Sequence, residues 1–382
     1  MITKNAPAQT EVPQTFLAGL TPAQFMRRHW QKKPLLIRQA FPQFQPLLTK
    51  AQLFDLAARD NVESRLVQQS ARGWTMRHGP FTSLPSTKRD HWTLLVQGVD
   101  LHDDAVHALL RTFCFIPASR LDDVMISYAT TGGGVGPHFD SYDVFLLQAY
   151  GRRRWRIARR YDPTLRTDVP LKILAQLQAE QDFVMEPGDM LYLPPGYAHE
   201  GVAQDECMTY SIGFRVPRQD ELASEILLRL ADDLGHSCAG RLYRDVAQAA
   251  TSTPGHIPTA LEHFAQHILA QALRQPHAVA RALGEVLSEP KPLVSFETQR
   301  VPRRWQHVRL DRRTRMLYDE RHIFVNGEAF RASGKDAQIL RQLADTRTLD
   351  AKTLASLSTQ AKAIICNWYA AGWLCTDKPP VT

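Results

Sequence analysis

Cysteine is scarce in this chain, and its copies are scattered. The five cysteines form no CxxC pair, so neither a zinc knuckle nor a disulfide framework is indicated. No run approaches the roughly 18 apolar residues that a membrane-spanning helix needs, and the polar start MITKNAPAQTEVPQTF lacks the apolar core of a signal peptide. These absences predict an intracellular, cytoplasmic protein with no membrane segment.

A strong excess of either charge is also missing. The 382 residues include 46 basic and 39 acidic side chains, which gives a formal charge of +7. This excess is compatible with an acidic or nucleic-acid-rich neighbour but is too diffuse to establish one. Arginines do gather near the C-terminus, where they form either a solvated strand face or a docking surface for nucleic acid or an RNA-rich particle. They are Arg300, Arg303, Arg304, Arg309, Arg312, Arg313 and Arg315.

Three regions differ in composition. Residues 1–216 are rich in short apolar or alternating runs, such as VMISYA and DVFLLQAYG, separated by Gly/Pro turns, which predicts an all-β sandwich or barrel. The helical stretches PAQFMRRHW and AQLFDLAARD precede these strands. Residues 217–288 show helical spacing in LASEILLRLADDLG and TALEHFAQHILAQALRQ. Such a short helical segment covers its apolar faces either against a second copy, as a dimerisation segment, or against the β domain.

The last region, residues 289–382, begins within the linker-like stretch SEPKPLV, residues 288–294. RHIFVNGEAFR carries a hairpin signal at Asn326-Gly327. DAQILRQLAD and KAIICNWYAAGWL are predicted to be helices, an order that fits a small module of winged-helix type. Its last helix is too apolar to read bases in a DNA groove, which argues against a transcription factor.

The stretch GPHFDSYDVFLLQ holds a histidine and an aspartate two residues apart. On an extended segment, residues i and i+2 point to the same face, so His138 and Asp140 should converge. The same spacing occurs in His102-Asp103-Asp104, but DLHDDAVHALLR reads as a charged helical segment, in which residues i and i+2 do not face each other. The motif alone therefore decides nothing.

A third polar residue is found in PGDMLYLPPGYAHEG. A strand-like run and the Pro-Pro-Gly turn place His199 at the start of the next strand, in a spacing that resembles the second motif of the cupin superfamily. Ala203 stands where classical cupins have asparagine, and His-x-Asp replaces their His-x-His. Two histidines and one carboxylate are typical of the facial triad of non-haem Fe(II) oxygenases, which leaves metal positions open for a 2-oxo acid and O2.

A 2-oxoglutarate cosubstrate needs a basic anchor for its distal carboxylate. Arg153 in GRRRW follows the turn at Gly151, and strand alternation points it away from the face of Arg152 and Arg154. Arginine binds carboxylates with a planar fork. Ser127, on the strand VMISYA, is a second candidate for the same carboxylate.

Taken together, FMRRHWQKKPLLIRQA, MISYATTGGGVGPHFDSYDVFLLQ, GRRRW and PPGYAHEG resemble the JmjC-type ribosomal oxygenases. The resemblance is to the bacterial branch, which hydroxylates an arginine of the sixteenth large-subunit ribosomal protein. It implies an α+β fold, with a double-stranded β-helix (cupin/JmjC) barrel, N-terminal helices, a helical dimerisation domain and a C-terminal winged-helix-like domain. It also implies iron on His138, Asp140 and His199, 2-oxoglutarate on Arg153 with Ser127 assisting, and C3 hydroxylation of the arginine.

Two other functions fit the same residues. The first is the same chemistry on a different protein residue, either histidine or methyl-lysine. The second is a metal-free cupin that acts as a scaffold on ribosomes.

Overall fold

The structure is a computed structural model. Its internal contacts group the chain into two units, and the boundary along the chain lies between Val216 and Pro217. The structure describes residues 14–71, 73–237, 242–274 and 277–376. Among these, no helix combines the length and the hydropathy that a membrane crossing requires.

The first unit begins with helices whose ends are set by local capping. Thr21 and Gln24 form a capping box at α1, and Thr49 and Gln52 form another at α2, so backbone N–H groups of the first turn find partners. The predicted helices at both positions are confirmed. The helix predicted in DLHDDAVHALLR is confirmed too, and Asp103 caps it as α3. The helices are α1 (Pro22–Arg28), α2 (Lys50–Ala57) and α3 (Asp104–Arg111), with 3-10 turns at Thr15–Leu17, Val99–Leu101 and Ala118–Arg120.

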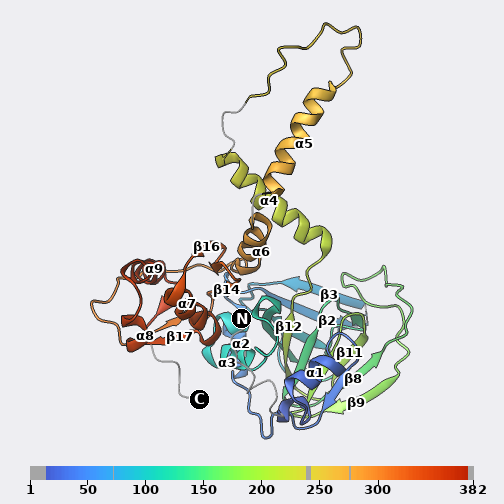
Figure 1. Cartoon of the computed structure of the whole chain (residues 1–382). Helices are drawn as coiled ribbons and strands as arrows, with labels where there is room; N and C mark the ends of the chain where they lie inside the picture. The colour runs from blue at the N-terminus through green and yellow to red at the C-terminus, as the bar shows by residue number, and fades with distance from the viewer. Residues whose placement is uncertain (1–13, 72, 238–241, 275–276, 377–382) are drawn as a thin grey trace. The chain divides into compact units, whose positions relative to one another are not determined.

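A large antiparallel sheet of eight strands packs on these helices (Figure 1). In spatial order its strands are β1 (Leu35–Ile37), β10 (Met190–Leu193), β7 (Val144–Tyr150), β12 (Cys207–Phe214), β5 (Leu121–Ala129), β4 (Trp92–Val96), β2 (Ser64–Ser70) and β3 (Gly73–His78). Strand β7 is apolar on both faces because both are covered. Phe145 and Leu147 join the core beneath the helices, whereas Val144 and Leu146 join a second core.

That second core lies against a smaller sheet of four strands. Trp155, Ile157 and Met185 of the small sheet pack there with Leu191 and Leu193 of the large one. The small sheet runs β6 (His138–Phe139), β11 (Ala198–Ala203), β8 (Arg153–Ala158) and β9 (Gln181–Met185). The two sheets thus form the double-stranded β-helix that the family resemblance implied.

The second unit begins with three helices, α4 (Gln219–Ser237), α5 (Thr259–Arg274) and α6 (Ala278–Ser288). Helical spacing predicts the first two, whereas α6 was not predicted, and Ser288, its last residue, was assigned to a linker. The spacing of Ala278, Ala282 and Val286, all buried, was the available signal. Helix α6 packs on the sheet β14–β16, where Gly284 gives room to the ring of Phe324. The division predicted at residue 288 stays a prediction.

The rest of the unit is a small α+β module with its own core. Its elements are β13 (His307–Leu310), β14 (Met316–Tyr318), β15 (His322–Val325), β16 (Glu328–Arg331), α7 (Gly334–Thr346), β17 (Thr348–Asp350), α8 (Ala351–Ala355), α9 (Thr359–Ala370) and β18 (Leu374–Cys375). The predicted hairpin is confirmed, with positive φ at Asn326 and Gly327. The last predicted helix is too long, because Gly372 turns the chain and Leu374 pairs with β13.

Candidate active site

His138 and His199 are cross-strand neighbours in the small sheet. They pair directly between β6 and β11, so both side chains project from the same face, with ring centroids 4.3 Å apart. Asp140 follows β6, and its carbonyl accepts a hydrogen bond from Gly196 N at 2.8 Å. Its Oδ2 lies 3.6 Å from His199 Nε2 and 4.0 Å from His138 Nε2. The sequence-predicted triad therefore meets within one small space.

The donor atoms of this triad fit a divalent metal ion. One ligand atom from each residue lies within 4.8 Å of the other two, somewhat wider than the spacing of about 3 Å around a bound ion. His138 Nδ1 is 2.9 Å from Gly136 O, and His199 Nδ1 is 3.0 Å from Tyr197 O. With each Nδ1–H donated to a carbonyl, each Nε2 keeps its lone pair for the metal.

Burial strengthens this preference at His199. The side chain is almost fully buried, and burial, followed by the neighbouring His138, lowers its pKa to about 4. At neutral pH the imidazole is therefore uncharged and able to coordinate. Two neutral imidazoles and one carboxylate would leave a bound divalent ion with net positive charge, which attracts an anionic cosubstrate.

The Arg153 side chain lies on the same face of the small sheet as that of His199, and Arg153 is only 6% exposed. Its Nη1 is 3.5 Å from the Oγ of Ser127, which lies on β5 of the large sheet. The structure therefore brings both predicted anchor residues together. Among the described residues, its Nε and Nη2 are buried without any hydrogen-bond partner. A buried guanidinium with two unused donors points to a missing anion.

The flanking arginines behave as alternation predicted. Arg152 Nε binds Asp205 Oδ2 and Arg154 Nε binds Asp182 Oδ1, each at 2.8 Å, and both arginine side chains are about half exposed. Arg153 is thus set apart from its neighbours by its orientation and by its lack of a carboxylate partner.

Comparison with known proteins agrees with this geometry. A JmjC domain model matches residues 108–222, and a ROXA-like winged helix model matches residues 266–375. The ribosomal protein uL16 3-hydroxylase of Escherichia coli is 37% identical over 272 residues, which cover 70% of this chain and 71% of that protein. A probable ribosomal oxygenase of Haemophilus influenzae is 30% identical, over 93% of this chain and 96% of that protein.

Solved structures show the same relationship. The E. coli ribosomal oxygenase YcfD superposes with a TM-score of 0.80 at 30% identity, over 93% of this chain and 98% of that one. A second YcfD structure, in complex with cobalt and 2-oxoglutarate, has a TM-score of 0.78. The chain belongs to the JmjC-type ribosomal oxygenases. Membership in this family confirms the predicted fold class and the predicted enzyme class, a dioxygenase.

In this ribosomal oxygenase an aromatic residue that was not among the predicted site residues, Trp155, lies between the metal triad and the anchor. Trp155 lies two residues after Arg153 on β8, and its ring is centred 6.0 Å from the His199 ring. The arginine guanidinium lies 5.9 Å from the same ring. Gly201, opposite Trp155 on β11, makes room for it, since a Cβ there would lie 2.8 Å from the indole. The same alternation that selected Arg153 would also have placed Trp155 inside.

A buried polar network next to the triad was also missed. Asp143 is fully buried and accepts hydrogen bonds from Tyr192 Oη at 2.6 Å and Gln31 Nε2 at 3.0 Å. Arg120 Nη2 lies 3.5 Å from the same carboxylate. Burial raises the pKa of Asp143, although these donors oppose the shift. The network ties the loop after Asp140 to the N-terminal segment, a link that no local sequence pattern indicates.

Proposed function

We propose that this chain is an Fe(II)- and 2-oxoglutarate-dependent oxygenase that hydroxylates C3 of an arginine in the large-subunit ribosomal protein uL16. The observation that carries the proposal is the pairing of the triad with an inward arginine that has no anion. The relatives support the substrate, since one is named for 3-hydroxylation of uL16 and others carry ribosomal oxygenase names. A related structure holds cobalt and 2-oxoglutarate.

His138 Nε2, the Asp140 carboxylate and His199 Nε2 would hold the iron. When bound, the iron and 2-oxoglutarate would supply the oxidising chemistry, in which 2-oxoglutarate loses carbon dioxide to give succinate, and the two atoms of O2 enter succinate and the new substrate hydroxyl. The chain contributes position and exclusion of water. Backbone carbonyls orient both imidazoles, and Trp155 with the apolar core of the small sheet keeps water from the floor of the site.

Arg153 would bind the distal carboxylate of 2-oxoglutarate through its unused Nε and Nη2. Ser127 would assist, because its hydroxyl lies beside Arg153 Nη1 and its own hydrogen bond to Thr209 O is long, at 3.4 Å. Anchoring one end of the cosubstrate at Arg153 leaves its 2-oxo acid end toward the triad, because His199 pairs with Ile157, four residues further along β8.

Mass spectrometry of ribosomal proteins tests the proposed reaction. Ribosomes from cells with the wild-type chain should carry one extra oxygen on a uL16 arginine, and cells with His138→Ala should lack it. Purified chain should also release succinate with a uL16 peptide and not with the same peptide carrying lysine in place of the arginine. Modification of a histidine or methyl-lysine instead would contradict the substrate assignment. No iron-dependent turnover, with His138→Ala equal to wild type, would favour the scaffold function.

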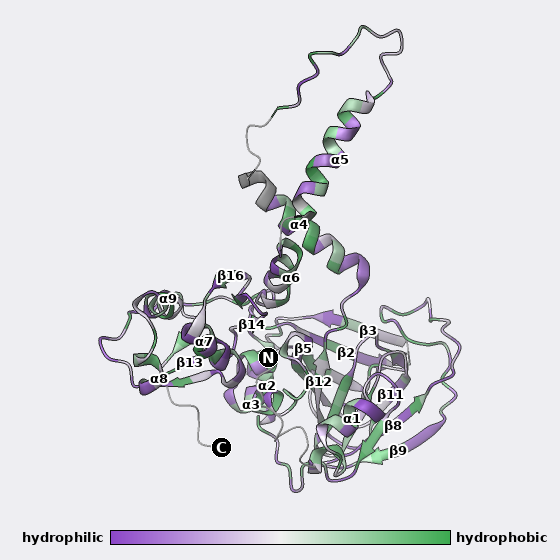
Figure 2. Cartoon of the chain, viewed as in Figure 1, coloured by the Kyte–Doolittle hydropathy of each residue, from purple (hydrophilic) through white to green (hydrophobic). Residues whose placement is uncertain are grey.

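We also propose that α4 and α5 form a homodimer with a second copy. Hydrophobic and hydrophilic residues alternate along both helices (Figure 2). Large apolar side chains of both are exposed, among them Leu227 and Leu228 of α4 and Leu269 and Leu273 of α5. Leu228 alone is 68% exposed. Light scattering should give a dimer mass for the wild type and a monomer mass for Leu228→Glu. Ala351→Glu adds the same charge at an exposed position of α8, outside both helices, and should stay dimeric, and a monomeric wild type would refute the proposal.

We propose that the arginine region around β13, residues 300–315, lies near ribosomal RNA, and that the enzyme works in the cytoplasm with its substrate. Arg313 is committed to Asp311, whereas Arg303 and Arg304 are exposed. Salt-dependent binding to ribosomes should weaken in Arg303→Gln/Arg304→Gln. An unchanged salt slope would remove the RNA contact.

A further inference from the structure

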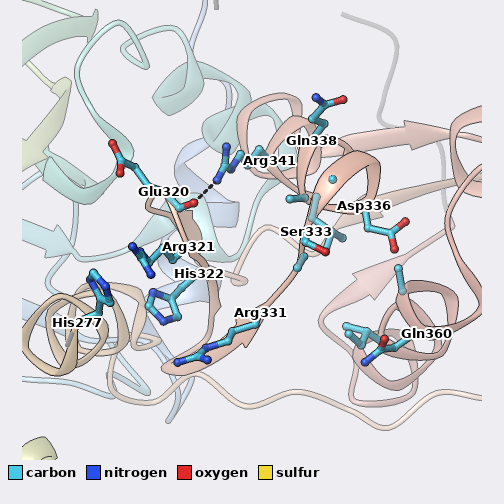
Figure 3. A pocket seen from close by; sticks show the side chains of 16 residues that line it. His277, Glu320, Arg321, His322, Arg331, Ser333, Asp336, Gln338, Arg341 and Gln360 are labelled. Atoms are coloured by element: carbon cyan, nitrogen blue, oxygen red, sulfur yellow. Dashed lines mark hydrogen bonds between the residues drawn. The ribbon is translucent and has the colours of Figure 1, made fainter. Parts of the chain in front are cut away.

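The second unit contains a cavity of about 690 Å³ that the oxygenase reaction does not use (Figure 3). It lies between the hairpin β15–β16 and helices α7 and α9. Its volume falls within the roughly 300–1,000 Å³ of small-molecule sites. The lining is rich in basic side chains, and its arginines are Arg321, Arg331 and Arg341.

His322 is a buried polar residue of the lining, at 3% exposure. Its Nδ1 is held by Asp319, with the carboxylate oxygens 3.1 and 3.2 Å away. The opposite ring nitrogen, Nε2, has no hydrogen-bond partner among the described residues. A histidine fixed by a carboxylate on one side and unpartnered on the other, in the wall of a cavity, points to a ligand.

Two arginines gather on the side of the cavity where His322 lies (Figure 3). Arg321 precedes His322 on the chain, and Arg331 ends β16. Neither guanidinium forms an ion pair within the described part of the chain. The acidic residues of the lining do not neutralise them. The Asp336 carboxylate accepts hydrogen bonds from Ser358, and the Glu320 carboxylate points away from this side (Figure 3).

The N-terminus of α7 adds positive potential to the same cavity. The helix has 13 residues and begins at Gly334, and the Ser333 side chain at the N-cap makes no capping hydrogen bond. N–H groups of a first helical turn have no partner within the helix, and the aligned peptide dipoles favour an anion there. Half-buried Arg341 also lines the cavity, and its Nη2 donates to Glu320 O at 2.7 Å.

We propose that this cavity binds a phosphate group carried by a ligand of nucleotide size. Arginine recognises phosphate oxygens through its planar fork. The two arginines and the helix end together offer more donors than the two oxygens of a carboxylate can accept. The unpartnered Nε2 of His322 accepts a hydrogen bond, which the P–OH of a phosphate monoanion can donate. The cavity also has more volume than inorganic phosphate fills. A free nucleotide and the 5′ end of an RNA both present this chemistry.

Calorimetric titration of the full-length chain tests the proposal without iron or 2-oxoglutarate, so its outcome is separate from that of the oxygenase assignment. The probes are sodium phosphate, AMP, and one short RNA with and without a 5′-phosphate, at constant ionic strength. Arg331→Gln should weaken binding by about tenfold or more, as expected for a lost charge-assisted hydrogen bond. Lys352→Gln removes the same charge from exposed α8 and should change affinity less than about twofold.

Ser333→Asp gives a second, independent variant. Aspartate is a favoured N-cap, so the variant should fold at least as well as wild type while it places a negative charge at the cavity. Binding should be lost without a fall in the thermal midpoint. AMP and phosphate binding would identify a free nucleotide, and binding only of 5′-phosphorylated RNA would identify an RNA end. No saturable heat with any probe, equal weakening by Arg331→Gln and Lys352→Gln, or full binding by Ser333→Asp would overturn the proposal.

Discussion

Replacement of Arg153 by glutamine should change cosubstrate binding and protein stability in opposite directions. The guanidinium is 6% exposed, and two of its nitrogens have no partner among the described residues. If they bind the distal carboxylate of 2-oxoglutarate, two charge-assisted hydrogen bonds at about 1.5–3 kcal/mol each are lost. The apparent affinity for 2-oxoglutarate should then fall by roughly 100-fold or more.

The ligand-free protein should respond differently. Without an anion, Arg153 is a buried charge without a counter-ion, which costs free energy of folding. Arg153→Gln should therefore have a thermal midpoint equal to or above that of wild type, but 2-oxoglutarate should no longer raise it.

The assay measures succinate formation against 2-oxoglutarate concentration, together with thermal midpoints with and without the cosubstrate. Arg154→Gln is the matched control, because it changes the next residue of β8, which faces solvent and binds Asp182. An unchanged KM for 2-oxoglutarate in Arg153→Gln, or an equal rise in Arg154→Gln, would refute the reasoning.

Three further predictions concern the surroundings of the site. The lowered pKa of His199, about 4 against 6.5 in the unfolded chain, means that the unfolded state binds more protons between these values. Metal-free protein should thus lose about 3 kcal/mol of unfolding free energy as pH falls from 6.5 to 4. In His199→Gln the denaturant midpoint should change less with pH across that window. A pH dependence as steep as that of wild type would contradict this. Gly201→Ala should displace the Trp155 ring and cost about 1–3 kcal/mol by overpacking, with reduced turnover. A wild-type thermal midpoint and turnover would show that the indole moves freely. Asp143→Ala should leave the buried Tyr192 hydroxyl and the Gln31 amide without an acceptor and cost about 3 kcal/mol in urea unfolding. Tyr192→Phe should cost about 1 kcal/mol in the same measurement. Equal losses would argue against the network.

The sequence was sufficient for the parts of the site that follow strand periodicity. Alternation placed His138 with Asp140 and turned Arg153 inward, and the Pro-Pro-Gly turn put His199 at the start of a strand. Local rules do not report which strands become neighbours. The direct pairing of β6 with β11, and the approach of Ser127 to Arg153 from the other sheet, depend on long-range contacts.

Similar limits explain the errors elsewhere. The last helix was predicted to run to Leu374 because the residues up to that point are apolar. Leu374 is apolar for another reason, since it fills the core of the module from strand β18. Helix α6 was missed although its buried alanines follow helical spacing. Asp143 gave no signal at all, because its meaning depends on Tyr192 and Gln31, which are distant in the sequence.

The rung that pairs His138 with His199 makes the triad sensitive to the length of the chain between β10 and β11. Strand faces alternate with every residue, so one residue inserted or deleted at Pro194-Pro195-Gly196 would move β11 by one position and turn the imidazole of His199 to the opposite face of its strand. The barrel could keep its core if the shift were absorbed locally, yet the metal would lose a ligand. In this enzyme a single-residue length change in a surface turn is therefore equivalent to a mutation of the active site.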